Sequence, residues 1–316
     1  MISLYLQRII REIIPLSGFT SSVGLLNGKM GISMLLYQYT KYIHDAEVED
    51  YTGYLINEII ENLAEASFCD FDSGFIGIGW GVNQLIADGL IEIDSDEMLE
   101  DIDKALWDET GLCLVESEQM AGVGLYILSR KETSKYVALW DQRLSAWLKD
   151  LERITVQPET TCQSYDIIYA MYCFSVCRKS GLFIEEINKI WPKLATFIEF
   201  EYHRTTSITE KYILYHLCVL MGKTECLPFL HDPFPESTWH PTLSDINWFY
   251  WYKLLCNKWG IKTPDVFTAK INSIVSDQTK MDELLSSLNP QKVVLENIVG
   301  GFAWSLLQFS IENSSI

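Results

Sequence analysis

A short glycine-containing segment recurs along this chain at intervals of about 45 residues. The sequence NGKMGI at residues 27–32 reappears as SGFIGI at residues 73–78, and shorter copies follow at residues 119–123 and 297–302. The interval from Gly122 to Gly301 equals about four periods and leaves room for three degenerate copies. The chain is therefore predicted to contain seven repeats, each of them one supersecondary unit.

Each repeat is predicted to hold two helices of different character. Four segments combine an apolar face with a charged face: residues 53–66, 97–107, 135–153 and 184–202. In the first segment the apolar face consists of Leu55, Ile56, Ile59, Ile60 and Leu63. The other helix of each repeat carries few charges and is apolar nearly all round, which is typical of a buried helix. These helices begin near Gly31, Gly77, Gly122, Ile167, Ile213, Ile246 and Gly301. The alternation predicts an outer and an inner layer.

Two all-α architectures fit this pattern. An open solenoid of HEAT type has the right period, but its terminal repeats need polar capping faces. A closed toroid needs no caps, because the last repeat packs against the first. The final repeat, NIVGGFAWSLLQF at residues 297–309, is among the most apolar segments of the chain. We therefore predict an α/α toroid of seven helical hairpins, formed by residues 1–316 as a single domain.

The repeated glycines are predicted to be structural. Glycine in a helix costs about 1 kcal/mol relative to alanine, so its recurrence at one repeat position indicates a shared geometric need. At the start of an inner helix, that need is either a close backbone approach or a turn with positive φ. The glycines concerned are Gly28, Gly31, Gly74, Gly77, Gly122, Gly124, Gly300 and Gly301.

Charge and hydropathy exclude two classes of partner. The net charge of −19 would repel nucleic-acid phosphates, and no cluster of basic residues offsets it. The first 18 residues have apolar positions three and four apart with charges between them, which predicts an amphipathic helix and not a signal sequence. No stretch of about 18 uncharged apolar residues exists, so we expect no membrane span. Scattered cysteines favour reduced, buried thiols in a cytoplasmic protein.

The glycine segments resemble those of a known family. Residues 24–31 (GLLNGKMG) and 74–81 (GFIGIGWG) are similar to the inner-helix motifs of the lanthionine synthetase C-like family, and Gly122 with Gly124 and Gly300 with Gly301 are weaker matches. The similarity covers residues 20–130 and returns at 293–310. It implies a barrel of seven helical hairpins that handles a modified precursor peptide. In active cyclases of the family, two cysteines and a histidine hold zinc, which binds the substrate thiolate.

This chain departs from the family at the zinc ligands. It has neither the Cys-His-Gly nor the Trp-Cys-x-Gly motif, so no catalytic residue can be carried over. His216 and Cys218 are two apart on a predicted helix and cannot share a face. Cys173 and Cys177 lie well inside an inner helix, where packing explains them. We therefore expect no zinc and no other cofactor.

One alternative zinc set remains open. Cys162 begins the fourth inner helix, and His203 and His240 lie in the loops that precede the fifth and sixth. Zinc requires three or four such ligands within about 2.0–2.3 Å. We favour the absence of zinc over this set of ligands.

Polar residues just before the inner helices are candidates to line a cavity mouth. They are Asn27, Asp72, Ser73, Glu118, Gln119, Gln163, Asp166, Glu210, Asp245, Asn247, Glu296 and Asn297. Helix capping explains any one of them, whereas a ring of carboxylates suits acid–base work or a cationic peptide. Trp248 adds an aromatic surface in the run DINWFYWY, and residues 231–241, with three prolines, form a loop that covers the mouth. Of these, we select Asp72, Ser73, Asp166, Asp245, Asn247 and Trp248.

Three functions follow from these expectations. The first is a lanthionine synthetase C-like protein that binds a peptide or a thiol ligand, with a precursor peptide or its modifying enzymes as partners and without zinc-dependent cyclase activity. If the chain is active, it forms thioethers by an altered mechanism. The second is a carbohydrate-active toroid that uses two of Asp72, Asp166 and Asp245. The third is a non-enzymatic scaffold whose centre is filled by Trp80, Trp248, Trp251 and Trp304.

Overall fold

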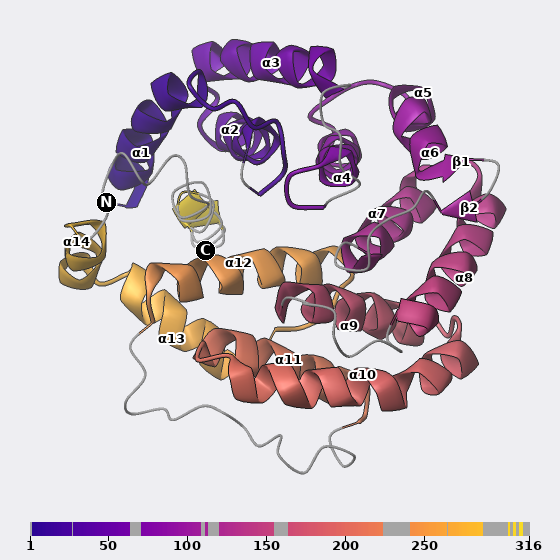
Figure 1. Cartoon of the computed structure of the whole chain (residues 1–316). Helices are drawn as coiled ribbons and strands as arrows, with labels where there is room; N and C mark the ends of the chain where they lie inside the picture. Colours follow the sequence, from indigo (N-terminus) through magenta and orange to yellow (C-terminus); the bar gives the residue numbers. More distant parts are fainter. Residues whose placement is uncertain are drawn as a thin grey trace. The chain divides into compact units, whose positions relative to one another are not determined.

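The computed structural model describes most of the chain, and the described part is helical except for one short hairpin (Figure 1). The residues described are 2–26, 28–63, 71–108, 111–112, 120–154, 164–223, 241–263, 265–286, 303, 306–307 and 310–311. The chain divides into two compact units. Met1–Ala64 and Pro235–Ile316 form the first unit, and Glu65–Phe234 forms the second. The predicted all-α class is confirmed.

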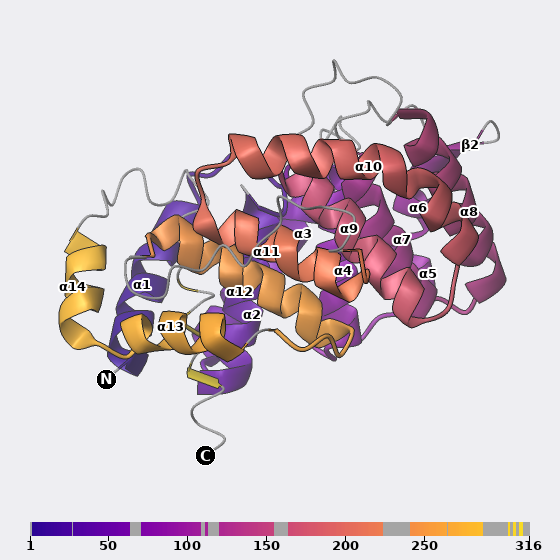
Figure 2. The ribbon, with the colours of Figure 1, turned by 90° about the horizontal axis from the view of Figure 1, so that it is seen from below.

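The second unit contains a row of neighbouring inner helices. Helix α4 packs against α7, α7 packs against α9, and α9 packs against α11. Helix α6 packs against α4, α8 packs against α7, and α10 packs against α9 and α11. Figure 2 shows the arrangement after a 90° turn. The elements are α4 (Phe75–Ala87), α5 (Ser95–Met98), α6 (Glu100–Leu106), β1 (Trp107–Asp108), β2 (Gly111–Leu112), α7 (Met120–Thr133), α8 (Val137–Ile154), α9 (Ser164–Lys179), α10 (Ile184–Arg204) and α11 (Ile208–Leu220). Strands β1 and β2 pair antiparallel, with Trp107 opposite Leu112.

The first unit contains both ends of the chain. Helix α2 packs against α1 and α3, and α13 packs against α14. Its helices are α1 (Ile2–Ser17), α2 (Lys29–Ile43), α3 (Ala46–Glu61), α12 (Leu243–Lys258), α13 (Asp265–Val275) and α14 (Gln278–Ser286). Helix α1 is amphipathic as predicted, because Leu6, Ile10 and Ile13 are buried while Arg8 and Arg11 are exposed. Among the described residues, no helix is long and apolar enough to cross a membrane.

The two predicted kinds of helix are both present. The inner helices are buried on most sides: every residue of α4 from Ile76 to Leu85 is buried. The outer helices have one solvent-exposed face. The four predicted amphipathic segments correspond to α3, the α5–α6 pair, α8 and α10. One detail of the prediction is wrong. Ile60 is 41 % exposed and lies outside the buried face of α3, which contains Leu55, Ile56 and Ile59 together with Val48 and Thr52.

Several inner helices end in a left-handed glycine that the repeat analysis did not identify. Gly89 follows α4 with φ 68°, and Gly181 follows α9 with φ 71°. The N–H of Leu90 donates to the Leu85 carbonyl at 2.9 Å, and that of Leu182 donates to the Cys177 carbonyl at 2.8 Å. This is the Schellman arrangement, which satisfies the last carbonyls of a helix and favours glycine because glycine has no Cβ.

Candidate functional site

The glycines at the start of α2 are required by close backbone contact. A Cβ on Gly31 would lie 2.0 Å from the carbonyl oxygen of Leu25, and a Cβ on Gly28 would lie 2.4 Å from the backbone nitrogen of Gly24. Residues 22–25 fold back over the helix start, where the N–H of Lys29 donates to the Ser22 carbonyl at 3.0 Å. Gly28 has φ −152°, so close approach and not a left-handed turn is the geometric need here.

The second unit has the same kind of contact at the start of α7. A Cβ on Gly122 would lie 2.2 Å from the Cβ of Phe71, and a Cβ on Gly124 would lie 2.5 Å from the Trp147 ring. Gly74 is the N-cap of α4, and Gly77 is buried within that helix. Gly300 and Gly301 lie outside the described residues.

Candidate mouth residues of the second unit occupy the approach to α4. Asp72 is half-buried and Ser73 is exposed, directly before the N-cap Gly74. Asp166 lies in the first turn of α9, but its side chain is outside the described residues. This unit therefore presents a carboxylate and a hydroxyl at the start of one inner helix.

Candidate residues of the first unit lie in the first turns of α12. Asp245 is buried in a capping box, where its Oδ2 accepts bonds from the Thr242 N–H at 2.9 Å and the Thr242 hydroxyl at 2.7 Å. In return, the Asp245 N–H donates to the Thr242 Oγ1 at 3.2 Å. A carboxylate held in this way stabilises a helix start. Asn247, Trp248 and Trp251 are half-buried.

The described cysteines are poor metal ligands. Cys173, Cys177, Cys218 and Cys256 are buried. Burial raises the pKa of Cys177, Cys218 and Cys256 to about 12, so their thiolates do not form near neutral pH. Among the residues that the structure describes, no group of three or more His, Cys, Asp or Glu side chains could hold a metal ion. The absence of zinc stays a prediction.

The two histidines considered as ligands have different surroundings. His216 is buried in α11, and desolvation lowers its pKa to about 4, which keeps the imidazole neutral. His203 is exposed in the last turn of α10, so its predicted loop position is wrong. Helix α10 continues to Arg204 because Thr205 caps it, the Thr205 N–H donating to the Glu201 carbonyl at 2.8 Å. Cys162 and His240 lie outside the described residues.

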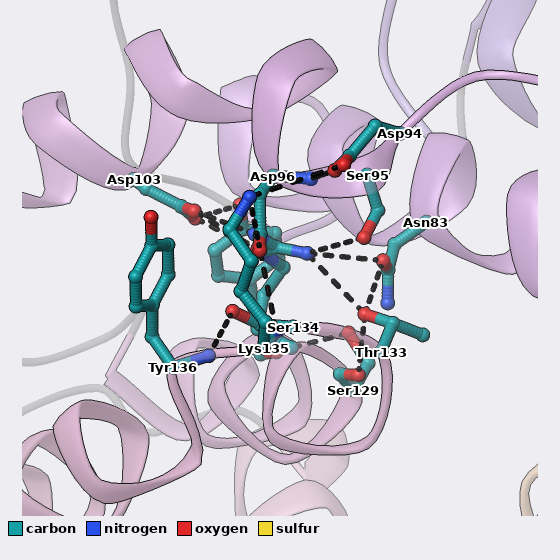
Figure 3. A network of polar contacts seen from close by, with 12 residues as sticks. Asn83, Asp94, Ser95, Asp96, Asp103, Ser129, Thr133, Ser134, Lys135 and Tyr136 are labelled. Atoms are coloured by element: carbon teal, nitrogen blue, oxygen red, sulfur yellow. Dashed lines mark hydrogen bonds and ion pairs between the residues drawn. The ribbon is translucent and has the colours of Figure 1, made fainter.

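The densest polar cluster surrounds Arg130, which sequence reasoning did not select (Figure 3). Arg130 lies near the end of α7 and its side chain is 0 % exposed. Its Nη2 is 2.7 Å from Asp96 Oδ1 and 2.9 Å from Asp103 Oδ2, and its Nε is 3.2 Å from the same Asp103 oxygen. Its Nη1 donates to the Ser95 hydroxyl at 3.1 Å. A buried guanidinium is thus paired with two carboxylates and bonded in several directions.

The two carboxylates of this cluster have different environments. Desolvation raises the pKa of Asp103, which also accepts a 2.5 Å bond from the Tyr126 hydroxyl. The pKa of Asp96 is lowered, because hydrogen bonds from Ser134, the Lys135 N–H and Arg130 together outweigh its desolvation. Burial beside Asp103 raises the pKa of Tyr126 well above its usual value. The arrangement favours a permanent ion pair over proton transfer.

The Arg130 cluster joins four helices of the second unit. Asp96 belongs to α5, Asp103 to α6, Asn83 to α4 and Arg130 itself to α7. Asn83 accepts a 2.8 Å bond from the Thr133 hydroxyl and a 3.5 Å bond from Arg130. Two sequence signals could have found this cluster: an arginine that directly follows the apolar run of an inner helix, and the acid-rich run at residues 92–103. Neither signal shows which carboxylates pair with Arg130.

The first unit has a smaller buried ion pair. The ammonium of Lys29, at the start of α2, contacts the carboxylate of Glu58 on α3. The Lys29 side chain is 5 % exposed and that of Glu58 is 30 % exposed. Lys29 lies between the two repeat glycines, so this pair ties the motif to the outer helix.

Comparison with known proteins adds no relative. No family model, no curated protein and no solved structure matches this chain.

Proposed function

We propose that this chain is a degenerate lanthionine synthetase C-like α/α toroid of seven hairpins that binds a peptide or thiol ligand at the glycine-bearing starts of its inner helices. The observation that carries the proposal is the crowding at Gly31 and Gly122, where a Cβ would lie 2.0 and 2.2 Å from a neighbouring atom. In both units the glycine at this repeat position has no room for a side chain, as expected if the hairpins repeat one geometry. In such a barrel, the free N–H groups of the inner helices face one mouth.

Two further observations support parts of this proposal. The first unit contains both the N-terminal and the C-terminal segment of the chain, as closure of the last repeat on the first requires. The described cysteines are buried, and burial raises the pKa of three of them to about 12, so they would not activate a ligand thiol. The proposed activity is therefore ligand binding in peptide maturation, in the cytoplasm, without zinc-dependent ring closure.

The carbohydrate-active alternative has less support, because Asp245 is engaged in a capping box. The scaffold alternative is weakened by Trp248 and Trp251, which remain half-buried. Trp80, in contrast, is 2 % exposed, as the scaffold alternative expects.

The test uses a fluorescein-labelled peptide that carries one cysteine and one dehydroalanine. We expect the purified protein to bind it without forming a thioether, and to contain much less than one equivalent of zinc. Trp248→Leu and Ser73→Trp are each expected to weaken binding several-fold, while Tyr54→Leu, on an exposed position of α3, leaves it unchanged. Ring closure together with one equivalent of tightly held zinc would overturn the proposal. Unchanged binding by both mouth variants would do so as well.

A further inference from the structure

The solvent-exposed face of α1 carries a basic ridge. Four exposed positions of this helix follow one another in steps of four, three and four residues, which places them on one face. They are Leu4, Arg8, Arg11 and Pro15, and we call them the α1 ridge. The Nε of Arg8 lies 3.3 Å from the carboxylate of Glu12, at the edge of the ridge. Arg11 forms no ion pair with any residue that the structure describes, so its charge is available to a partner.

The solvent-exposed face of α3 carries an acidic ridge. Four exposed positions follow one another in steps of three, four and seven residues, which again places them on one face. They are Glu47, Asp50, Tyr54 and Glu61, and we call them the α3 ridge. The Tyr54 side chain is 63 % exposed, and its ring stacks on that of Tyr51 with the centroids 6.5 Å apart. The ridge therefore combines carboxylates with one oriented aromatic ring.

The two ridges belong to helices that touch each other within the first unit. The Tyr51 hydroxyl of α3 donates to the Ile14 carbonyl of α1 at 3.0 Å, and it lies 2.6 Å from the Ser17 hydroxyl. Both helices fall in the segment Met1–Ala64 of that unit. One molecule therefore presents a basic and an acidic ridge in a fixed relation to each other.

The charges of these two helices differ from those of their neighbours. Among the outer helices α1, α3, α6, α8 and α10, only α1 has more basic than acidic residues, and only α3 has no basic residue. Such complementary faces attract each other. The net charge of −19 opposes association of two copies. At physiological ionic strength, however, charges more than about 8 Å apart are largely screened, so the facing residues decide.

We propose that the α1 ridge docks onto the α3 ridge of a second copy of this chain. In an antiparallel arrangement Arg11 faces Glu47 and Arg8 faces Asp50, because both pairs are three residues apart on their helices. A two-fold axis makes this contact twice, with α1 of each copy against α3 of the other, and it closes the assembly as a dimer.

The same register adds an apolar contact. Leu4, which is 69 % exposed, meets Tyr54, because each lies four residues from the neighbouring charge of its ridge. This contact matters because exposed ion pairs alone contribute little. Both helices have 16 residues and are about 24 Å long. Their ridges bury less than the roughly 1,600 Å² of a stable complex, so the dissociation constant should be on the order of 100 µM. This inference does not rest on the proposed ligand site.

The test is sedimentation equilibrium of the whole protein at concentrations from about 5 to 500 µM, which span the expected dissociation constant. We expect a monomer–dimer equilibrium. Arg8→Glu with Arg11→Glu should weaken dimerisation at least about tenfold, and Glu47→Lys with Asp50→Lys should do the same, because each brings like charges together. All four side chains are exposed, and thermal melts check that each variant is folded.

Combining the two charge reversals gives the sharpest result. In an equimolar mixture of the two double variants, each α1 ridge meets an α3 ridge of opposite charge, so dimers should form again. A single chain with all four substitutions should also dimerise. A damaged fold would not recover in this way. Failure of both combinations to restore the dimer would overturn the proposal.

A matched control separates local pairing from net charge. Lys149→Glu with Lys189→Glu reverses two exposed charges on α8 and α10, and it changes the net charge by the same amount as the double arginine variant. This control should leave dimerisation unchanged. An equal loss in the control would overturn the proposal, as would a wild-type protein that stays monomeric over the whole range. A dimer that neither ridge reversal weakens would use another surface, and would overturn it too.

Discussion

The two ends of α7 meet their neighbours in opposite ways. At its start, Gly122 is pressed against Phe71, and the contact works because a side chain is missing. Near its end, Arg130 fills the space between helices with a long charged side chain and bonds to Asp96 and Asp103. The first contact limits the volume of one residue, whereas the second depends on the chemistry of several residues. Four predictions sharpen this contrast, from the largest expected effect to the smallest.

Replacing Arg130 with methionine should be the most destabilising change. The substitution leaves Asp96 and Asp103 with side chains 9 % and 20 % exposed and without their cation. Breaking a buried pair from one side costs about 3–5 kcal/mol. The free energy of unfolding in urea measures this loss. Lys104→Met is the control in the same unit, because its ion pair with Glu100 is exposed and should contribute little to stability. Equal losses in the two variants would contradict the structural role assigned to Arg130.

Gly122→Ala should cost about 3 kcal/mol, the upper part of the range for overpacking. The added methyl group would meet the Cβ of Phe71 at 2.2 Å, an atom that cannot swing aside without moving the backbone. Urea unfolding again gives the value. A combined Gly122→Ala, Phe71→Gly variant is informative, because glycine removes the Cβ of Phe71. It should lose less than the sum of the two single changes if this contact is the cause. Strictly additive losses in the free energy of unfolding would argue against this contact as the cause.

His216 should make stability depend on pH. Its pKa is lowered from 6.5 to about 4 by burial in α11, so the unfolded chain binds a proton more readily than the folded one. The contribution is fully present above pH 6.5 and is lost as the pH falls toward 4. At pH 5 the loss amounts to about 2 kcal/mol. Comparing wild type with His216→Gln at pH 7.5 and pH 5 isolates it. The variant should lose less stability over that interval, and an unchanged pH slope would refute the assignment.

Gly53→Ala should have the smallest effect and the opposite sign. Gly53 lies within α3, and its nearest neighbour for an added Cβ is the Tyr37 hydroxyl at 3.9 Å, so no clash arises. Alanine should stabilise the helix by up to about 1 kcal/mol. A thermal melt compared with that of Gly122→Ala separates glycines that are sterically required from those that are not. A destabilised Gly53→Ala protein would break this distinction.

Sequence reasoning succeeded for features that repeat or that concern one helix. The amphipathic character of α1, α8 and α10 follows from the spacing of apolar residues, and the small number of charged residues predicted the inner helices. It failed where tertiary neighbours decide. Ile60 looked like part of an apolar stripe but is 41 % exposed. For Asp245 the sequence left a choice between helix capping and a cavity carboxylate, and the structure shows its Oδ2 bonded to the hydroxyl and the N–H of Thr242 at the same helix start.

By itself, the sequence determined that this chain is helical, that its helices alternate between buried and half-wet, and that glycine recurs where the inner helices begin. These properties depend on local periodicity and backbone sterics, which a single segment already contains. Only the tertiary structure decided which atoms the glycines avoid and which carboxylates Arg130 binds. Such pairings join residues that are far apart in the sequence, as Gly122 and Phe71 or Arg130 and Asn83 are. They depend on packing geometry that no local pattern records.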